Sequence, residues 1–425
     1  MVGRLDSWRH ILAARWLAVG GLTGDALLYG ASALFALGLG FTSGEPAQWH
    51  WGYLSTPAYA VAAVAALAVA RRRVARDTRV RVALLGLVVL GAVALPLGLE
   101  ARWRHLDPGA AFAQPEVSVI ERSAGYLSHG QDPYRAYVHN GHVVDAVKGL
   151  PAYESFFPYF PLMGVFGLPS AATHKGAGLT DARIVMSLMT LLVSALALVL
   201  LRTSREKKIL VAQVLLALPT GALFLATGGD DMPILALILL GVAGLQRRST
   251  YIAGISLGLA AAMKLTAWPA AAGALLVART RDGRSAARRV AAIVAVIVGV
   301  TVIPFVVKDP WSFVSNVVAF PLGLAGVHSP AASPLPGHIL TTLWPPLGHV
   351  LAPVALLVMG YFGTRYVREH WPIDLSEMLA LLAVAFGVMI LSASATRLGY
   401  LIYPLNLALW SRVTVRLPER VPELV

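Results

Sequence analysis

Apolar segments of nearly twenty residues recur along the whole chain, and they constrain its fold more than any other feature. A helix of about 20 apolar residues spans the roughly 30 Å hydrocarbon core of a bilayer. Only 13% of the residues are charged, whereas soluble proteins average about 25%. The alternating strands of about ten residues that build outer-membrane barrels are not visible. We therefore expect an all-α polytopic membrane protein.

The basic residues are distributed as the positive-inside rule requires. The net charge is +13, but most Lys and Arg lie in short loops between apolar segments and at the two ends of the chain. Such a pattern sets topology and favours contact with anionic membrane lipids, not with nucleic acid. The loops expected in the cytoplasm are 71–81, 202–208, 247–248, 279–289 and 365–368.

With these loops in the cytoplasm, we expect about eleven to thirteen membrane segments. Residues 251–278 are expected to form a broken pair of short helices that turns near Lys264–Pro269, and the proline-rich residues 156–172 a half-span or re-entrant piece. The remaining expected helices are 25–42, 53–70, 82–99, 183–201, 209–226, 231–246, 288–306, 347–363, 376–392 and 399–412.

Two adjacent acids lie between two of these helices. Asp231 precedes a helix with Pro233 in its first turn, a position that suits an N-cap. One acid suffices as a cap, so the second of the pair Asp230–Asp231 needs another partner, such as a cation, a ligand hydroxyl or a metal. A carboxylate pair in mid-bilayer would be costly, so we expect the pair at the outer end of the hairpin.

The long external stretch 100–155 and its continuation carry an ordered series of motifs. Glu116 lies fourteen residues before Gly130, and Asp132-Pro133-Tyr134 and then Tyr159-Phe160-Pro161-Leu162 follow. This order resembles the family-87 glycosyltransferases of the C-type (GT-C) superfamily. Their first external loop reads as an acid, a short helix, Gly-x-Asp-x-Tyr and then Tyr-Pro-Pro-Leu.

Three later segments resemble the same family, and the resemblance covers about residues 82–410. Gly229-Asp230-Asp231 lies where the family often has a Gly-Gln-Asn type of turn. Residues 253–269 (AGISLGLAAAMKLTAWP) and 396–405 (TRLGYLIYPL) look like its Ala-Gly, Gly-Leu-Ala, Lys, Pro pattern and its terminal Arg-x-x-Tyr/Pro segment. The chain departs from the family at Glu116, where an Asp is expected as the catalytic acid.

The resemblance implies a GT-C-like module over residues 82–412 with external loops 100–155 and 307–346. Residues 1–81 would add an N-terminal cap and two extra transmembrane helices, and 413–425 a cytoplasmic tail. The implied enzyme is a membrane glycosyltransferase of the cell envelope, of the kind that builds lipoglycans. It would move a sugar, often mannose, from a polyprenyl-phosphate donor to a lipid or glycan acceptor on the outer face of the cytoplasmic membrane. The Ala-, Val-, Leu- and Arg-rich composition suggests a GC-rich bacterium.

This chemistry needs a carboxylate base, cations for the leaving phosphate, and aromatic and polar contacts for the sugar. The candidate bases are Glu116, Asp107, Asp230 and Asp231. The candidate phosphate or lipid ligands are Lys264, Arg397, Lys308, Arg104, His328 and His338. The candidate sugar or acceptor contacts are Tyr126, Tyr134, Tyr159, Trp268 and Tyr400. We expect these groups to gather at one site that faces away from the cytosol.

Several alternatives stay open at this point. The chain has no cysteine, which excludes disulfides and thiolate metal sites, but paired acids could hold Mg²⁺ or Ca²⁺. No nucleotide-binding fingerprint is present, which fits a lipid-linked donor. A transporter or flippase for a lipid-linked sugar would use the same basic and aromatic residues, and a non-catalytic GT-C-like partner would have lost the catalytic Asp. The large polar stretch 100–155 favours an enzyme, because transport sites usually lie near mid-membrane.

Overall fold

The described residues form a largely helical membrane protein. The computed structural model describes residues 21–72, 77–107, 112–173, 178–327 and 331–415. Within them, six helical segments are long and apolar enough to cross a bilayer, or seven if the bent pair α9–α10 counts as one span. One small antiparallel sheet pairs β1 (Val138–His139) with β2 (His142–Val143). The expected all-α polytopic class is confirmed.

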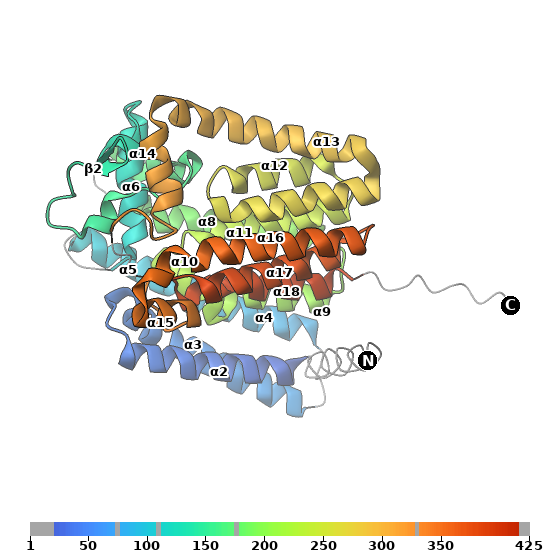
Figure 1. The fold of residues 1–425 in the computed structure, drawn as a ribbon. Coiled ribbons are helices and arrows are strands. Elements are labelled where there is room, and N and C mark those ends of the chain that lie inside the picture. Colours follow the sequence, from blue (N-terminus) through green and yellow to red (C-terminus); the bar gives the residue numbers. More distant parts are fainter. Residues whose placement is uncertain (1–20, 73–76, 108–111, 174–177, 328–330, 416–425) are drawn as a thin grey trace. The chain divides into compact units, whose positions relative to one another are not determined.

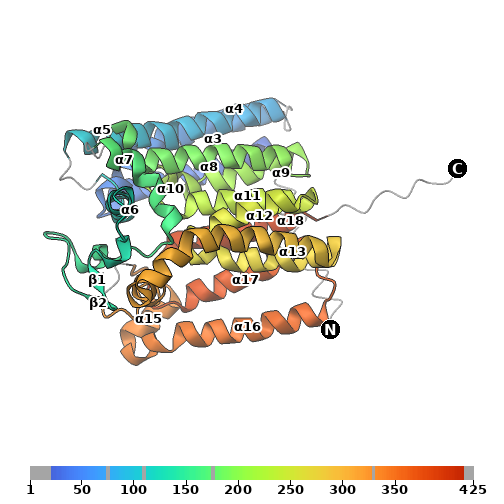
Figure 2. The same ribbon diagram turned by 90° about the horizontal axis from the view of Figure 1, so that it is seen from above.

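The chain divides into two compact units, which we describe separately. Unit 1 comprises Met1–Gln114, Ala177–Ile184 and Ser204–Gly229, and unit 2 comprises Pro115–Gly176, Val185–Thr203 and Asp230–Val425. Helix α8 (Ala182–Leu200) begins in unit 1 and continues in unit 2. The element labels are those of Figures 1 and 2.

Unit 1 is built from six α-helices within the described residues. Its helices are α2 (Leu22–Thr42), α3 (Pro46–Arg71), α4 (Thr78–Val89), α5 (Leu95–Leu106), α9 (Arg205–Ala212) and α10 (Pro219–Thr227). A π-helical turn, η1 (Leu90–Ala94), joins α4 to α5. The segment from α9 to α10 bends by 42° just before Pro219, because proline has no N–H to continue the helix.

Unit 2 contains the other described α-helices, besides most of α8. They are α6 (Pro115–Ser128), α7 (Leu168–Thr173), α11 (Asp231–Gln246), α12 (Thr250–Ala261), α13 (Trp268–Lys308), α14 (Pro310–Val314), α15 (Pro336–Leu343), α16 (Leu351–Glu369), α17 (Leu375–Ser392) and α18 (Ile402–Val413). Helix α13 is a hairpin of two arms, because Gly283 between them has a φ of +88°, a left-handed value that glycine adopts without strain. Figure 1 shows the chain reversing there.

The expected break within residues 251–278 is present. Helix α12 ends at Ala261, Lys264 is extended, and a short 3₁₀ turn, η7 (Leu265–Ala267), leads into α13. Residues 161–173 form a 3₁₀ segment, η4 (Pro161–Gly167), followed by the six-residue α7. Several other expected segments are helices shorter than a full span, such as α11 and α12. The number of membrane crossings therefore stays a prediction.

The basic connections of unit 2 meet at one end of its helices. The Gln246 side chain accepts a hydrogen bond from the Arg202 backbone N–H at 2.9 Å, and the Gln246 carbonyl accepts one from Arg281 at 3.0 Å. The Thr280 hydroxyl donates to the Ile373 carbonyl at 2.9 Å. The 16-residue helix α11 separates Asp231 from this end, a length of about 24 Å at 1.5 Å per residue. Helices α6, α14 and α15 lie at the opposite end (Figure 1).

Close packing in unit 1 gives a testable prediction at Gly52 of α3. A Cβ at this position would lie 2.5 Å from the Ala36 carbonyl oxygen and 2.6 Å from the Gly40 nitrogen of α2. Gly52→Ala should therefore lower the thermal stability of the detergent-solubilised protein, by about 1–3 kcal/mol for an overpacked contact. Gly86→Ala is the matched control, because nothing lies within 4 Å of a Cβ there. Equal melting temperatures for the two variants would contradict this account of the α2–α3 contact.

Candidate functional site

Both acids of the Asp230–Asp231 turn face a cation instead of capping a helix. The N-cap position of α11 belongs to Asp230 and not, as expected, to Asp231, and the Asp230 side chain caps no backbone N–H. The Lys264 ammonium lies 2.6 Å from Asp230 Oδ2 and 2.6 Å from Asp231 Oδ1. Lys264 is thus the partner that the second acid required.

A second irregular segment holds the backbone around Lys264. The Phe160 N–H donates to the Met263 carbonyl at 2.9 Å, and the Leu162 N–H donates to the Ala262 carbonyl at 3.3 Å. These bonds satisfy carbonyl groups at the end of α12 that a continuous helix would have paired internally. The start of η4 therefore supports the break that presents the Lys264 side chain to the acids.

Burial and the ion pairs shift the pKa values of Lys264 and Asp230. Burial alone would lower the pKa of Lys264, but the Asp230 and Asp231 carboxylates outweigh it and hold that pKa well above its usual value. Lys264 is therefore charged at neutral pH. Burial raises the pKa of Asp230 to about 6, with the nearby Asp231 carboxylate adding to the rise and Lys264 opposing it.

Tyr403 of α18 orients Asp231 from the other side. Its hydroxyl donates to Asp231 Oδ1 at 2.7 Å and lies 3.0 Å from the Thr266 hydroxyl. Its ring stacks on Phe386 with centroids 5.1 Å apart. Asp231 thus receives hydrogen bonds from both Lys264 and Tyr403, which leaves it fixed in place.

Glu116 and Arg397 form a second ion pair. Glu116 lies in the first turn of α6, and Arg397 precedes the 3₁₀ turn η10 (Leu398–Leu401). Arg397 Nη1 donates to Glu116 Oε1 at 2.7 Å. The other oxygen, Oε2, is buried and has no hydrogen-bond partner among the described residues. One carboxylate oxygen is therefore held, and the other is buried without a hydrogen bond.

Tyr159 and Tyr400 lie close to both ion pairs. The Lys264 ammonium lies over the Tyr159 ring, 5.5 Å from its centroid. Burial raises the pKa of Tyr400 to about 12, and the charges of Lys264 and Arg397 both oppose that rise. The negative charge of Glu116 also contributes to the raised pKa of Asp230. We call the five charged residues the charged cluster: Glu116, Asp230, Asp231, Lys264 and Arg397.

The charged cluster lies wholly within unit 2 and brings together several of the residues that the sequence singled out. Three candidate bases, two candidate phosphate ligands and the candidate sugar contacts Tyr159 and Tyr400 belong to it or border it. Trp268 lies two residues beyond Thr266, its indole donates to the Ala261 carbonyl at 3.1 Å, and its side chain is half exposed.

Tyr134 and Tyr126 have their hydroxyl groups engaged. Tyr134 is 1% exposed, and its hydroxyl donates to the Tyr159 carbonyl at 2.7 Å. It therefore supports the segment that carries the Tyr159 ring. The Tyr126 hydroxyl donates to the Tyr137 hydroxyl at 3.2 Å.

The remaining candidates lie elsewhere. Lys308 is an exposed residue at the end of α13, and His338 of α15 is hydrogen-bonded through Nδ1 to the Ser394 carbonyl at 2.8 Å. Arg104 and Asp107 belong to unit 1, where Arg104 pairs with Asp181 at 3.0 Å and Asp107 is exposed at the end of α5. His328 lies outside the described residues.

Sequence reasoning missed Tyr403 and Thr266 as members of this site. Tyr403 stands in the quoted segment 396–405 and Thr266 directly after the helix break. The only sequence feature that points to these two residues is a hydroxyl group beside each motif. Nothing in the sequence distinguishes Tyr403 from an ordinary membrane-interface tyrosine, because its role depends on the packing of α18 against η7 and the turn before α11.

A comparison with protein families identifies the chain. Residues 157–399 match the model of glycosyltransferase family 87, which is more than half of the chain. The chain belongs to glycosyltransferase family 87. Neither a curated protein nor a solved structure matches it.

This family-87 protein is thus a membrane glycosyltransferase. The matched residues include Asp230, Asp231, Lys264 and Arg397, while Glu116 precedes them. Within the described ranges, no group of three or more His, Cys, Asp or Glu is arranged to hold a metal. The sequence left a divalent cation as an open alternative, and that alternative stays untested.

The pKa of Asp230 gives a prediction for infrared titration. Because the pKa lies near 6, Asp230 is protonated below that pH and ionised above it. A protonated carboxyl band should therefore appear as the pH is lowered through about 6, and it should vanish in Asp230→Asn. Asp374→Asn, at the N-cap of α17, serves as the control. A wild-type band that appears only near the ordinary Asp pKa of about 3.9 would contradict the prediction.

Lys264 gives a prediction for stability. Lys264→Met leaves two carboxylates without their cation, and breaking a buried ion pair costs about 3–5 kcal/mol. The melting temperature in detergent should fall, and the triple variant Lys264→Met/Asp230→Asn/Asp231→Asn should recover most of the loss. Lys308→Met, at an exposed position, should change little. A triple variant no more stable than Lys264→Met would refute the ion-pair explanation.

Proposed function

We propose that the charged cluster is the catalytic centre of this glycosyltransferase, and that Glu116 is its general base. The observation that carries the proposal is the asymmetry of the Glu116 carboxylate, with Oε1 held by Arg397 and Oε2 without a partner. A base needs one oxygen within hydrogen-bond reach of the acceptor hydroxyl and a fixed orientation. Asp231 is more constrained, because its Oδ1 already accepts hydrogen bonds from both Lys264 and Tyr403.

The donor we propose is a polyprenyl-phosphate sugar, with mannose as the first candidate. The acceptor is a lipid or glycan. The acceptor oxygen bonds to the anomeric carbon while Glu116 takes its proton, and the bond from that carbon to the phosphate oxygen breaks. The electron pair leaves with the polyprenyl phosphate, on which negative charge grows.

Two cations of the cluster suit that developing charge. Positive groups fixed where charge appears in the transition state lower its energy. The Arg397 side chain is 31% exposed and bonds to Glu116 through Nη1. A guanidinium carries five N–H donors, so the same side chain can hold both the base and a phosphate oxygen. Lys264 adds a second positive charge between the acids.

The orientation we propose follows from the basic connections of unit 2. They gather at the end of α11 opposite to Asp231, and basic loops lie in the cytoplasm by the positive-inside rule. The charged cluster then faces the outside of the cytoplasmic membrane, where a lipid-linked donor is the appropriate substrate class.

The experiment is a transfer assay with matched variants. Purified protein receives radiolabelled polyprenyl-phosphate mannose and an extract of membrane lipids as acceptors. Glu116→Gln should lower the turnover of sugar transfer by about 100-fold or more, as expected for loss of a general base. Glu121→Gln, the same change farther along α6 and outside the cluster, should retain activity.

Other results would redirect the proposal. An active Glu116→Gln with an inactive Asp230→Asn would assign the base to Asp230. Sugar that crosses vesicle membranes without a new glycosidic bond would favour a transporter and overturn the proposal.

A further inference from the structure

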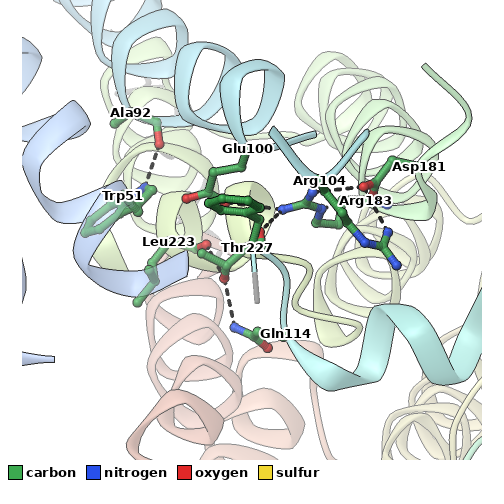
Figure 3. Close-up of polar contacts among 10 residues, drawn as sticks. Trp51, Ala92, Glu100, Arg104, Gln114, Asp181, Arg183, Leu223 and Thr227 are labelled. Carbon is green, nitrogen blue, oxygen red and sulfur yellow. Dashed lines mark hydrogen bonds and ion pairs between the residues drawn. The ribbon is translucent and has the colours of Figure 1, made fainter. Parts of the chain in front are cut away.

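Unit 1 contains a buried charge network that holds a carbonyl of the segment leading to α6. Arg183 is 0% exposed and donates to both oxygens of Asp181, at 3.0 and 2.9 Å, and to Glu100 at 3.2 Å. It also donates to the Phe112 carbonyl at 2.6 Å. Arg104 adds a bond to Asp181 at 3.0 Å. Figure 3 shows these side chains converging. The network fixes the chain at Phe112.

Two residues later, Gln114 is tied to Thr227 at the end of α10. The Gln114 backbone N–H donates to the Thr227 carbonyl at 3.0 Å, and the Gln114 side-chain amide donates to the Thr227 hydroxyl at 2.8 Å. That hydroxyl in turn donates to the Leu223 carbonyl at 2.8 Å. Thr227 is 0% exposed. We call this two-bond contact the Gln114–Thr227 bridge; Figure 3 shows the bond between the two side chains.

The chain leads directly from both sides of the bridge to the charged cluster. Glu116 follows Gln114 by two residues, and Asp230 follows Thr227 by three. Consecutive Cα atoms are about 3.8 Å apart, so the two links reach at most about 8 and 11 Å. The backbone of each short segment is constrained, because Pro115 has a fixed φ and Gly228 has a φ of +103°.

We propose that Gln114 and Thr227 are positioning residues for sugar transfer. The bridge sets where the two segments that carry Glu116 and Asp230 begin, and it thereby holds the base at its working distance from the other acids and Lys264. Neither residue contacts the substrate. The proposal rests on the function proposed above, and it concerns alignment because misplacing a base by about 1 Å can cost about 100-fold in rate.

The experiment separates alignment from loss of stability. Thr227→Val keeps the shape of the side chain and removes the hydroxyl, and Gln114→Ala removes the amide. Thr227→Ser restores a hydroxyl. Trp51→Phe is the control, because it removes a different buried hydrogen bond of unit 1, from the Trp51 indole to the Ala92 carbonyl at 2.8 Å. These four variants and the double variant Thr227→Val/Gln114→Ala are assayed for kcat, donor KM and melting temperature.

We expect Thr227→Val and Gln114→Ala to lower kcat by about tenfold or more with donor KM changed less than about twofold. Thr227→Ser should keep most of the wild-type kcat, and Thr227→Val/Gln114→Ala should be no worse than either single variant. Trp51→Phe should lower the melting temperature and keep kcat.

Two outcomes would overturn the positioning role. One is a Thr227→Val variant with normal kcat, and the other is a Trp51→Phe variant that loses as much kcat as Thr227→Val. In either case wild-type protein that transfers sugar leaves the proposed function intact. Wild-type protein that makes no glycosylated product overturns the proposed function itself.

Discussion

The ammonium of Lys264 lies between two carboxylates, and the arrangement of one end of unit 2 follows from the need to keep that charge paired. An unpaired cation beside apolar helices is costly. To reach Asp230 and Asp231, the chain interrupts a helix, and the start of η4 pairs with the carbonyls that the interruption exposes. Tyr403 donates a second hydrogen bond to Asp231 Oδ1. The helix break, the supporting segment and the acidic turn thus together keep the Lys264 charge paired.

The Glu116–Arg397 pair differs from this arrangement in the number of hydrogen bonds that its carboxylate accepts. Oδ1 of Asp231 accepts two hydrogen bonds, whereas Oε1 of Glu116 accepts one and its buried Oε2 has no partner in the described structure. The two pairs approach the same tyrosines, Tyr159 and Tyr400. An ammonium held by two acids, beside a guanidinium paired with a third, suits a reaction that must accept one proton and stabilise one leaving anion.

The sequence was sufficient to predict the membrane class, most helix positions and the break at Lys264. These features depend on local hydropathy and on one charged residue between apolar halves, which are visible without a fold. The sequence also singled out the acids at 116, 230 and 231. It could not show that Glu116 pairs with Arg397, because the two are 281 residues apart. Arg104 illustrates the same limit, since its pairing with Asp181 depends on the fold of unit 1.

The short hairpin α11–α12 has a consequence for how the chain enters the bilayer. Gly241 and Gly244 of α11 lie directly against Leu257 and Ala253 of α12, so the two helices pack closely. Asp230 and Asp231 lie at the start of the first helix, and Lys264 follows the second. The hairpin thus carries its own counter-ions at the end where the acids and Lys264 meet. A pair that crosses neutralised avoids much of the roughly 2.5–3.5 kcal/mol that each separate charge costs, which favours insertion of the two helices as one unit during biosynthesis.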